Sequence, residues 1–370
     1  MTDGTVCVAP GTYEEQITID KSATIMSLGS SDNTTIAPPS SLSGTDSLIT
    51  VQGSSVTATV NGFTIAGPMS GLDHGVYVRE KAEVTIINNE IVDLRRGSLG
   101  SGGVAIYVGD RTVPTSGSAT IANNTFTGYA KSAVVVDSMG SQATIRNNTI
   151  TGAGETGKVQ QNGIQVSHGA KATITNNTIE NHKYEPTGEA ATGIAFGSAA
   201  DGVSVNDNTI RKNEVGLAIR NTDQAVIKGN DIVNNKFDTD SSFGVVIQGE
   251  SSNNEIRDND IRDNWTGIGI SPATQDGPAP SSNEAQGNNI VGNEQFAVDL
   301  RSTDNDFNAS NNWWGSDKGP KDVEGNTEAS TSNCPNNPKN TDPSDQLGNP
   351  VADSVDGGQV QYCPWATSQQ

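Results

Sequence analysis

One short phrase recurs along the chain, and it constrains the fold more than any other feature of the sequence. Residues 172–179 read Ala-Thr-Ile-Thr-Asn-Asn-Thr-Ile, and residues 58–65 repeat the frame with Phe63 in the Asn slot. Aligned on its second Asn, the phrase places Asn at nine positions spaced by 22 to 35 residues: Asn89, Asn124, Asn148, Asn177, Asn208, Asn230, Asn259, Asn288 and Asn312. A repeat of this period cannot bury its own apolar face, so it predicts a solenoid of stacked copies.

Most copies are followed by Gly or Ala and then by alternating aliphatic residues, as in residues 75–78 and 163–166. Alternation with a period of two is typical of strands, so each module predicts three short strands and the chain predicts an all-β stack of about eleven coils. The recurring Asn suits a sharp bend, because Asn tolerates the left-handed backbone region. Its amide also supplies a donor and an acceptor, and we expect it to hydrogen-bond the like residue of each neighbouring coil.

Three stretches carry a resemblance to a known group of proteins: the Asn-Asn-x-Ile repeats, residues 8–15 (Val-Ala-Pro-Gly-Thr-Tyr-Glu-Glu) and residues 311–320, with Tyr-Cys-Pro-Trp at 362–365. The chain resembles right-handed parallel β-helix repeat proteins, which include pectate lyases, alginate epimerases and carbohydrate-binding and sugar-hydrolase repeat domains. The resemblance implies a single-stranded right-handed parallel β-helix over residues 1–314 and an irregular capping segment over residues 315–370. Trp313, Trp314 and Trp365 are interpreted as bulk against the last coil, and stacking on sugar rings is the alternative.

Charge excludes some partners. With 22 basic residues against 43 acidic ones and a net charge of −21, the chain lacks the concentrated Lys and Arg that nucleic acid or an anionic membrane requires. No apolar run reaches transmembrane length, so membrane insertion is not expected. The acidic surface fits either a protein from a high-salt organism or a merely acidic secreted one. We expect an extracellular or cell-surface location, and a strand so soon after Met1 suggests a part of a longer protein.

The three cysteines are an odd set. Cys334 and Cys363 fall in the irregular C-terminal region, where a disulfide would restrain a poorly ordered segment, and we expect them to pair. Cys7 lies in an alternating Thr-Val-Cys-Val run and is predicted to be a small core residue.

The outward face of the Gly-h-x-h strands, where h is an inward aliphatic residue, holds the candidate site. In the polysaccharide enzymes that this chain resembles, the substrate lies along that sheet. Removing the proton next to a uronate carboxylate needs a cation to neutralise the carboxylate and a base or acid on the sugar face. The candidate catalytic residues are His74, Arg79, Tyr107 and Asp137, and the candidate substrate-binding residues are Tyr77, Arg95, Arg96 and Arg111. The alternative is that these are ordinary solvated side chains of a β-helix wall.

Other motifs are weak or missing. Neither the Asp-Pro-His-Asp epimerase signature nor the Gly-His-Gly of polygalacturonases occurs, and no carboxylate motif accompanies His168 or His182. No metal centre or cofactor is predicted. Calcium stays open because acidic clusters supply oxygen ligands, although alternation along a strand sends neighbouring side chains to opposite faces. The clusters are Asp258, Asp260 and Asp263, and Asp304 with Asp306.

Two functions from different classes fit these observations. The first is a secreted or surface β-helix that binds polysaccharide, with lyase, epimerase or hydrolase action on acidic glycans left open. The second is a non-enzymatic structural or adhesive rod, such as a cell-envelope component or a virus fibre. An enzyme should bring Arg, Tyr, His and carboxylate side chains together on the outward face, whereas a rod should disperse them. The sequence gives no indication of the oligomeric state.

Overall fold

The computed structural model describes residues 4–99, 102–113, 115–185, 190–237, 242–274, 277–301, 305–316, 319–322, 350–352 and 359–370. Nearly all regular structure in these residues is β-strand, and one 3₁₀ turn, η1 (Ser31–Asn33), is the exception. The residues group into two compact units, Met1–Ile194 (unit one) and Ala195–Gln370 (unit two). β21 (Thr192–Gly197) contains the boundary between them.

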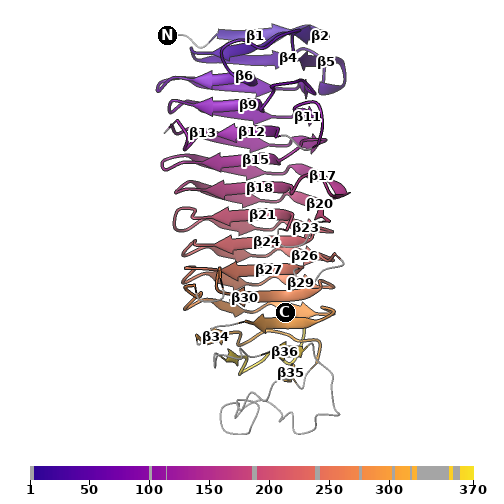
Figure 1. Ribbon diagram of the computed structural model, residues 1–370, viewed down its shortest axis with the longest axis vertical. Helices are drawn as coiled ribbons and strands as arrows, with labels where there is room; N and C mark the ends of the chain where they lie inside the picture. The colour runs from indigo at the N-terminus through magenta and orange to yellow at the C-terminus, as the bar shows by residue number, and fades with distance from the viewer. Residues whose placement is uncertain are drawn as a thin grey trace. The chain divides into compact units, whose positions relative to one another are not determined.

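Unit one consists of three parallel sheets, A, B and C, in which each strand pairs with the equivalent strands one repeat before and after it (Figure 1). Sheet A contains β1 (Gly4–Val8), β4 (Ala23–Ser27), β7 (Thr57–Asn61), β10 (Glu83–Ile87), β13 (Ser118–Ala122), β16 (Gln142–Arg146) and β19 (Lys171–Thr175). Sheet B contains β2 (Gly11–Glu14), β5 (Thr34–Ala37), β8 (Thr64–Ala66), β11 (Glu90–Val92), β14 (Thr125–Thr127), β17 (Thr149–Thr156) and β20 (Thr178–Tyr184). Sheet C contains β3 (Ile17–Ile19), β6 (Ser47–Gln52), β9 (His74–Arg79), β12 (Val104–Val108), β15 (Ser132–Asp137) and β18 (Asn162–Ser167).

Unit two has the same three-sheet organisation, and its sheets are named in the same way. Its A strands are β22 (Ser204–Asn206), β25 (Val226–Lys228), β28 (Glu255–Arg257), β31 (Glu284–Gln286), β34 (Phe307–Asn308) and β37 (Val360–Gln361). Its B strands are β23 (Thr209–Arg211), β26 (Asp231–Val233), β29 (Asp260–Arg262) and β32 (Asn289–Val291). Its C strands are β24 (Val215–Arg220), β27 (Phe243–Gln248), β30 (Thr266–Ser271), β33 (Phe296–Leu300), β36 (Pro350–Ala352) and β35 (Lys321–Asp322).

The core forms from inward-facing residues of the strands, as the period of two predicts, although β1 and β2 contain no buried residue. In β9, for example, Val76 and Val78 are fully buried, and they align with Ile106 and Val108 of β12. Because the strands are parallel and in register, like side chains lie over like from one coil to the next. The prediction of stacked three-strand modules in parallel sheets is therefore confirmed. The count of about eleven coils stays a prediction.

The recurring Asn residues form a continuous ladder of side-chain amides inside each unit, and each of them is at most 3% exposed. In unit one, the Asn148 side-chain oxygen accepts from the Nδ2 of Asn124 at 3.1 Å and from its backbone N–H at 2.9 Å. Asn148 in turn donates through Nδ2 to Asn177 Oδ1 and to the carbonyl of Ile121, both at 2.9 Å. Each buried amide is thus satisfied by the coils on either side of it, as a ladder requires.

The bend itself is made by a different residue from the one that forms the ladder. The residue directly before each ladder position takes the left-handed conformation, as Asn88, Asn123, Asn147 and Asn176 do with φ between 54° and 57°. We expected one Asn to perform both tasks, and this expectation was wrong. The αL position points its side chain outward, so Asp207 and Gly229 replace Asn there in unit two.

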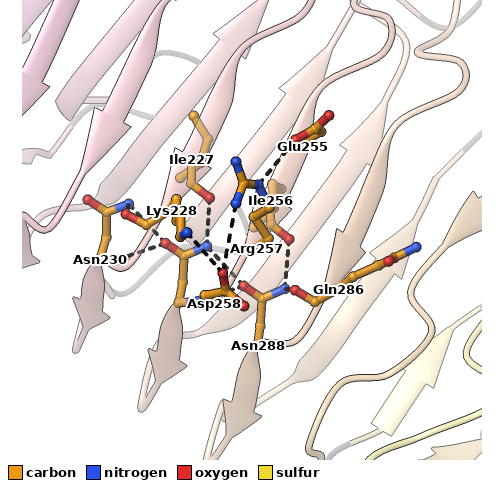
Figure 2. Close-up of polar contacts among 10 residues, drawn as sticks. Ile227, Lys228, Asn230, Glu255, Ile256, Arg257, Asp258, Gln286 and Asn288 are labelled. Atoms are coloured by element: carbon orange, nitrogen blue, oxygen red, sulfur yellow. Dashed lines mark hydrogen bonds and ion pairs between the residues drawn. The ribbon is translucent and has the colours of Figure 1, made fainter. Parts of the chain in front are cut away.

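Unit two contains further ladders that the sequence analysis missed. Figure 2 shows Asn230 and Asn288 of the expected ladder, and the side-chain amide of Asn288 donates to the carbonyl of Ile256 in the preceding coil at 2.8 Å. A second ladder joins Asn213, Asn235, Asn264 and Asn293 at the turn between sheets B and C. A shorter one joins Asn254 to Asn283 at 2.8 Å, between sheets C and A. In unit two, all three turns of a coil are therefore stabilised by a ladder of buried Asn side chains.

Cys7 is exposed and free, so its prediction as a core residue was wrong. Register explains the error. Val6 aligns with the buried Ile25 of β4, and the alternation along the strand therefore turns Cys7 outward with Met26. Cys363 is disulfide-bonded. Its expected partner, Cys334, lies outside the described residues.

The described parts of residues 315–370 add strands β35, β36 and β37 to the sheets of unit two. β37 pairs with β34, and β36 pairs with β33. Trp314 and Trp365 are 0% and 5% exposed, a burial that favours the capping interpretation over stacking on a sugar. The domain boundary at residues 314 and 315 stays a prediction, because residues 323–349 lie outside the described part of the chain.

We expect Asn148→Ala to lower the free energy of unfolding by about 3 kcal/mol, because several buried groups would lose their partners at once. Asn147→Gly is the matched control: Asn147 is exposed and has φ of 56°, which Gly adopts freely, so the change should stay below about 1 kcal/mol. Urea unfolding followed by circular dichroism measures both. Equal destabilisation of the two variants would contradict the ladder's role.

Candidate functional site

The candidate residues gather on the outward face of sheet C in unit one, along β9, β12, β15 and β18. Tyr77 of β9 aligns with Tyr107 of β12, which aligns with Val135 of β15. One step further along the strands, Arg79 and Asp137 follow the aligned valines Val78 and Val136. The site is therefore made of two neighbouring rows of side chains that cross the strands.

Three aromatic rings form an aromatic cluster made of His74, Tyr77 and Tyr107. The ring centre of His74 lies 5.0 Å from that of Tyr77 and 4.8 Å from that of Tyr107, and the two tyrosine rings are 5.9 Å apart. Tyr77 is 5% exposed, whereas His74 and Tyr107 are intermediate between buried and exposed. His74 and Tyr107 therefore offer ring surface to a ligand, and Tyr77 supports them.

Burial sets the ionisation of the aromatic cluster. It lowers the pKa of His74 from 6.5 to about 4, and the nearby carboxylates of Asp73, Asp110 and Asp46 offset only part of this effect. His74 is therefore uncharged at neutral pH. Burial also raises the pKa of both tyrosines above its ordinary value, with the carboxylates of Asp110 and Asp137 adding to the effect. Both hydroxyls consequently stay protonated and act as hydrogen-bond donors.

Asp137 is the polar centre of the site, and its side chain is 3% exposed. Its Oδ2 accepts from the Tyr107 hydroxyl at 3.1 Å and from the backbone N–H of Arg111 at 3.2 Å. Its Oδ1 accepts from the Ser167 hydroxyl at 2.9 Å and contacts Nδ1 of His168 at 2.5 Å. Burial alone would raise the pKa of Asp137, but the hydrogen bonds from His168, Ser167 and the backbone of Arg111 lower it below its ordinary value.

A second carboxylate, Asp110, lies in the turn after β12. It accepts from the Tyr77 hydroxyl at 3.0 Å, and its other oxygen accepts from the backbone and hydroxyl of Thr112 at 2.7 Å and 2.6 Å. Each tyrosine of the aromatic cluster is thus held by its own carboxylate from the next coil or turn.

The four candidate arginines divide between the two ends of β9. Arg79 lies at the carboxyl end, over the Tyr77 ring at 5.5 Å from its centre, and pairs with Glu80 at 3.1 Å. Arg111 is exposed in the turn after β12, near the same end. At the amino end, Arg96 forms a two-pronged ion pair with Asp73, the residue before His74. Arg95 pairs instead with Asp93 at 3.2 Å.

Sequence reasoning missed two participants, His168 and Ser167. It found no carboxylate beside His168, but the structure places Asp137 there, 31 residues earlier in the chain. A spacing of about one repeat was the signal, because residues one coil apart become neighbours. His182, by contrast, is fully buried and bonds the hydroxyl of Tyr129 in the core.

The described residues contain no group of three or more His, Cys, Asp or Glu side chains arranged to hold a metal ion. Instead, Asp258, Asp260 and Asp263, which were suggested for calcium, contact basic side chains. Lys228 pairs with Asp258 at 3.6 Å, as Figure 2 shows, and Arg262 contacts both Asp260 and Asp263. Asp306 accepts hydrogen bonds from the backbone N–H of Gln359 and from the side-chain amide of Gln361. Asp304 lies outside the described residues.

Residues 47–157 and 140–314 match the family model described as a right handed beta helix region, and together they span more than half of the chain. The protein belongs to the right-handed β-helix family. The fold that the sequence resemblance implied is thereby confirmed. No curated protein sequence matches this β-helix.

Several solved structures share the fold. The A-module of the mannuronan C-5 epimerase AlgE4 of Azotobacter vinelandii superposes with a TM-score of 0.57 and 17% identity, over 99% of this β-helix and 91% of that chain. The Dettilon tailspike protein gives a TM-score of 0.55 and 14% identity, over 94% of this chain and 61% of that one. The periplasmic alginate epimerase AlgG gives 0.53 and 13%, over 80% and 73%. At these identities the likeness shows the fold alone.

In the described part of this β-helix, no helix has the length and apolar character needed to cross a membrane.

The burial of His74 predicts a pH dependence that NMR can measure. The Cε1–H resonance of His74, assigned by its loss in His74→Gln, should titrate with a midpoint about 4, well below the ordinary 6.5. Between these two values the unfolded chain binds more protons than the folded one, so stability should fall as the pH drops from 6.5 toward 4. A midpoint near 6.5 would show that the imidazole is not buried in the cluster.

Proposed function

We propose that this β-helix binds an acidic polysaccharide across the outward face of sheet C in unit one. The observation that carries the proposal is the aromatic cluster of His74, Tyr77 and Tyr107, flanked by arginines at both ends of β9. An extracellular or cell-surface location is part of this proposal, since such polymers occur there.

The partly exposed rings of His74 and Tyr107 support sugar binding by their apolar faces and polar edges. A pyranose ring presents C–H groups on one face, which pack against an aromatic ring, while hydroxyls at its rim take hydrogen bonds. Because His74 is uncharged at neutral pH, it adds ring surface to the site without adding a charge. The hydrogen bonds from Tyr77 to Asp110 and from Tyr107 to Asp137 fix both phenol rings in place before a ligand arrives.

The arginines support a polymer that carries carboxylates. Three arginines, Arg79, Arg96 and Arg111, lie beside the aromatic cluster in a chain whose net charge is −21. Arginine binds carboxylates through charge-assisted hydrogen bonds, which are stronger than neutral ones. Nε of Arg79 is buried and has no hydrogen-bond partner within the described residues, so one of its donors is unused. β9 spans about 16 Å at about 3.3 Å per residue, so its two ends contact different sugars of one chain.

Likeness in fold to two alginate epimerases agrees with a polysaccharide ligand, and likeness to a tailspike protein agrees equally with the alternative of a structural rod. The arrangement of side chains at the site described above distinguishes the two functions. A rod has no need for stacked aromatic side chains fixed by carboxylates, whereas a binding face does.

We expect retardation in affinity gels that contain uronate polymers, at a level well above that in gels of neutral polysaccharide. Arg79→Gln should weaken binding by about 10-fold to 100-fold, the range that corresponds to one charge-assisted hydrogen bond. Arg146→Gln, which changes a half-buried arginine on sheet A, should leave binding unchanged. Added salt should weaken binding, because exposed charges are screened.

A folded protein that no uronate polymer retards would contradict the binding function and favour the structural rod. Equal losses in the sheet A and sheet C variants would instead indicate attraction by overall charge, without a defined site.

A further inference from the structure

We propose that Asn123, Asn147 and Asn176 form an acceptor column for N-linked glycans, in which each side-chain amide takes an oligosaccharide from a polyprenyl pyrophosphate donor. The inference rests on the extracellular location that is part of the proposed function, because such donors serve exported proteins. It adds a covalent modification that the binding of a polysaccharide does not require.

The chain contains six Asn-x-Ser/Thr sequences, the pattern of an N-glycosylation acceptor. Their first residues are Asn33, Asn123, Asn147, Asn176, Asn264 and Asn308. The three residues of the acceptor column share one place in the fold. Each lies directly before a ladder position, at the turn that leads from a strand of sheet A to a strand of sheet B. The repeat thus places a common short motif in the same geometry on three successive coils.

This turn presents both reactive parts of the motif to solvent. The acceptor residues have φ between 54° and 56°, and their side chains are exposed, whereas the ladder residue that follows each of them is buried. One residue further on, the strand of sheet B begins with a Thr that faces outward again, and Thr125 and Thr149 are exposed. The amide and the hydroxyl of each motif therefore both lie on the outside of the coil.

The side-chain nitrogen of Asn123 is held weakly. It donates to Asn88 Oδ1 at 3.4 Å, which is long for a hydrogen bond. By contrast, Nδ2 of the neighbouring ladder residue Asn124 donates to Asn148 Oδ1 at 3.1 Å and to the carbonyl of Ile86 at 2.9 Å. A sugar on Asn123 therefore displaces little, whereas a sugar on Asn124 would break the ladder.

The acceptor column lies away from the proposed binding face. The aromatic cluster is on the outward face of sheet C, and the turn between sheets A and B is the one turn of a coil that no strand of sheet C enters or leaves. An N-linked glycan is bulky and well solvated. At this corner it leaves sheet C open to a polysaccharide.

Burial sets Asn264 apart from the acceptor column. Asn264 is 0% exposed, and its Nδ2 donates to Asn293 Oδ1 at 3.1 Å and to the carbonyl of Ile232 at 2.9 Å. A sugar on this nitrogen would leave buried groups without partners, which costs about 1–3 kcal/mol for each group. A chain that is modified at Asn264 therefore cannot complete its ladder.

Two other motifs differ from the acceptor column because the side-chain oxygen of the Asn is already bonded within its own turn or strand. Asn33 Oδ1 accepts from the backbone N–H of Ser30 at 3.1 Å and from the hydroxyl of Thr34 at 3.2 Å. Asn308 Oδ1 accepts from the hydroxyl of Ser310 at 2.8 Å. These contacts hold both side chains against the protein.

The transfer is a substitution at the first carbon of the sugar. Nδ2 of the Asn loses a proton and bonds to this carbon, while the bond from the same carbon to the pyrophosphate oxygen breaks. The polyprenyl pyrophosphate leaves with the electron pair. The transfer takes place on the unfolded exported chain, and folding then decides which modified chains survive, since unfolded protein is removed by proteases.

Two turns of the same geometry lack one part of the motif and serve as matched positions. Asn88 is exposed with φ of 57°, but Glu90 stands where the hydroxyl is needed. In unit two, Asp207 is exposed with φ of 54° and precedes Asn208 and Thr209, so only the acceptor amide is missing. Glu90→Thr and Asp207→Asn each complete the motif. Thr suits position 90, because Glu90 aligns with Thr64 and Thr125.

The experiment exports the full chain through a eukaryotic secretory host and analyses the folded, secreted protein. Peptide N-glycosidase in heavy-oxygen water removes each glycan and leaves a mass label on the residue that carried it, which peptide mass spectrometry locates. We expect the label at Asn123, Asn147 and Asn176 and none at Asn264.

Single variants test the motif and its geometry. Thr125→Val, Thr149→Val and Thr178→Val should each abolish the label at the Asn two residues earlier and leave it at the other two positions. Glu90→Thr should add a label at Asn88, and Asp207→Asn should add one at position 207. The triple Thr→Val variant should keep its retention in uronate gels, because the acceptor column is away from sheet C.

Each outcome decides one of the proposals. A secreted wild type without label at the acceptor column overturns the inference, and so does a label at Asn264 in the folded protein. Labelled wild type with no gain in either Glu90→Thr or Asp207→Asn overturns the role of the turn geometry. Retention in uronate gels without any label leaves the binding function intact. Label at the acceptor column without retention overturns the binding function alone.

Discussion

The ladder of buried side-chain amides is the interaction on which the rest of this structure depends. An amide enclosed in the coil interior without partners costs about 1–3 kcal/mol for each unsatisfied group. Asn148 avoids that cost only when Asn124 and Asn177 lie directly over and under it, and the same holds along the whole ladder. The ladder therefore stabilises the stack and also fixes the register between neighbouring coils.

Because the register between coils is fixed, outward side chains from successive coils lie in defined rows on the surface. The segments between ladder positions differ in length, yet Tyr77, Tyr107 and Val135 still align, because the differences are taken up in the turns. A site on this surface is therefore assembled from residues about one repeat apart. The contact of Asp137 with His168 across 31 residues is an example, and so is the contact of Tyr107 with Asp137 across 30.

Much of the candidate site could be predicted from residue types, but its internal order could not. Alternation along the strands correctly brought Tyr77, Arg79, Tyr107 and Asp137 to one face. It gave no information on burial, and burial lowers the pKa of His74 and removes Tyr77 from contact with solvent. It also gave no partner for His168, because the relevant carboxylate is close in space and distant in sequence. The irregular C-terminal region is the part that residue patterns described least.

The sequence by itself determined the architecture. The repeat length, the alternating aliphatic residues and the recurring Asn together favour stacked coils of short parallel strands. That arrangement buries the apolar faces and gives each side-chain amide its hydrogen-bond partners. Tertiary structure decided which side chains meet. Asn88 makes the bend while Asn89 joins the ladder, and Cys7 turns outward, because pairing with the next coil sets the direction of each side chain. The local sequence determines the period of the repeat, whereas the contacts between coils form only when the coils stack.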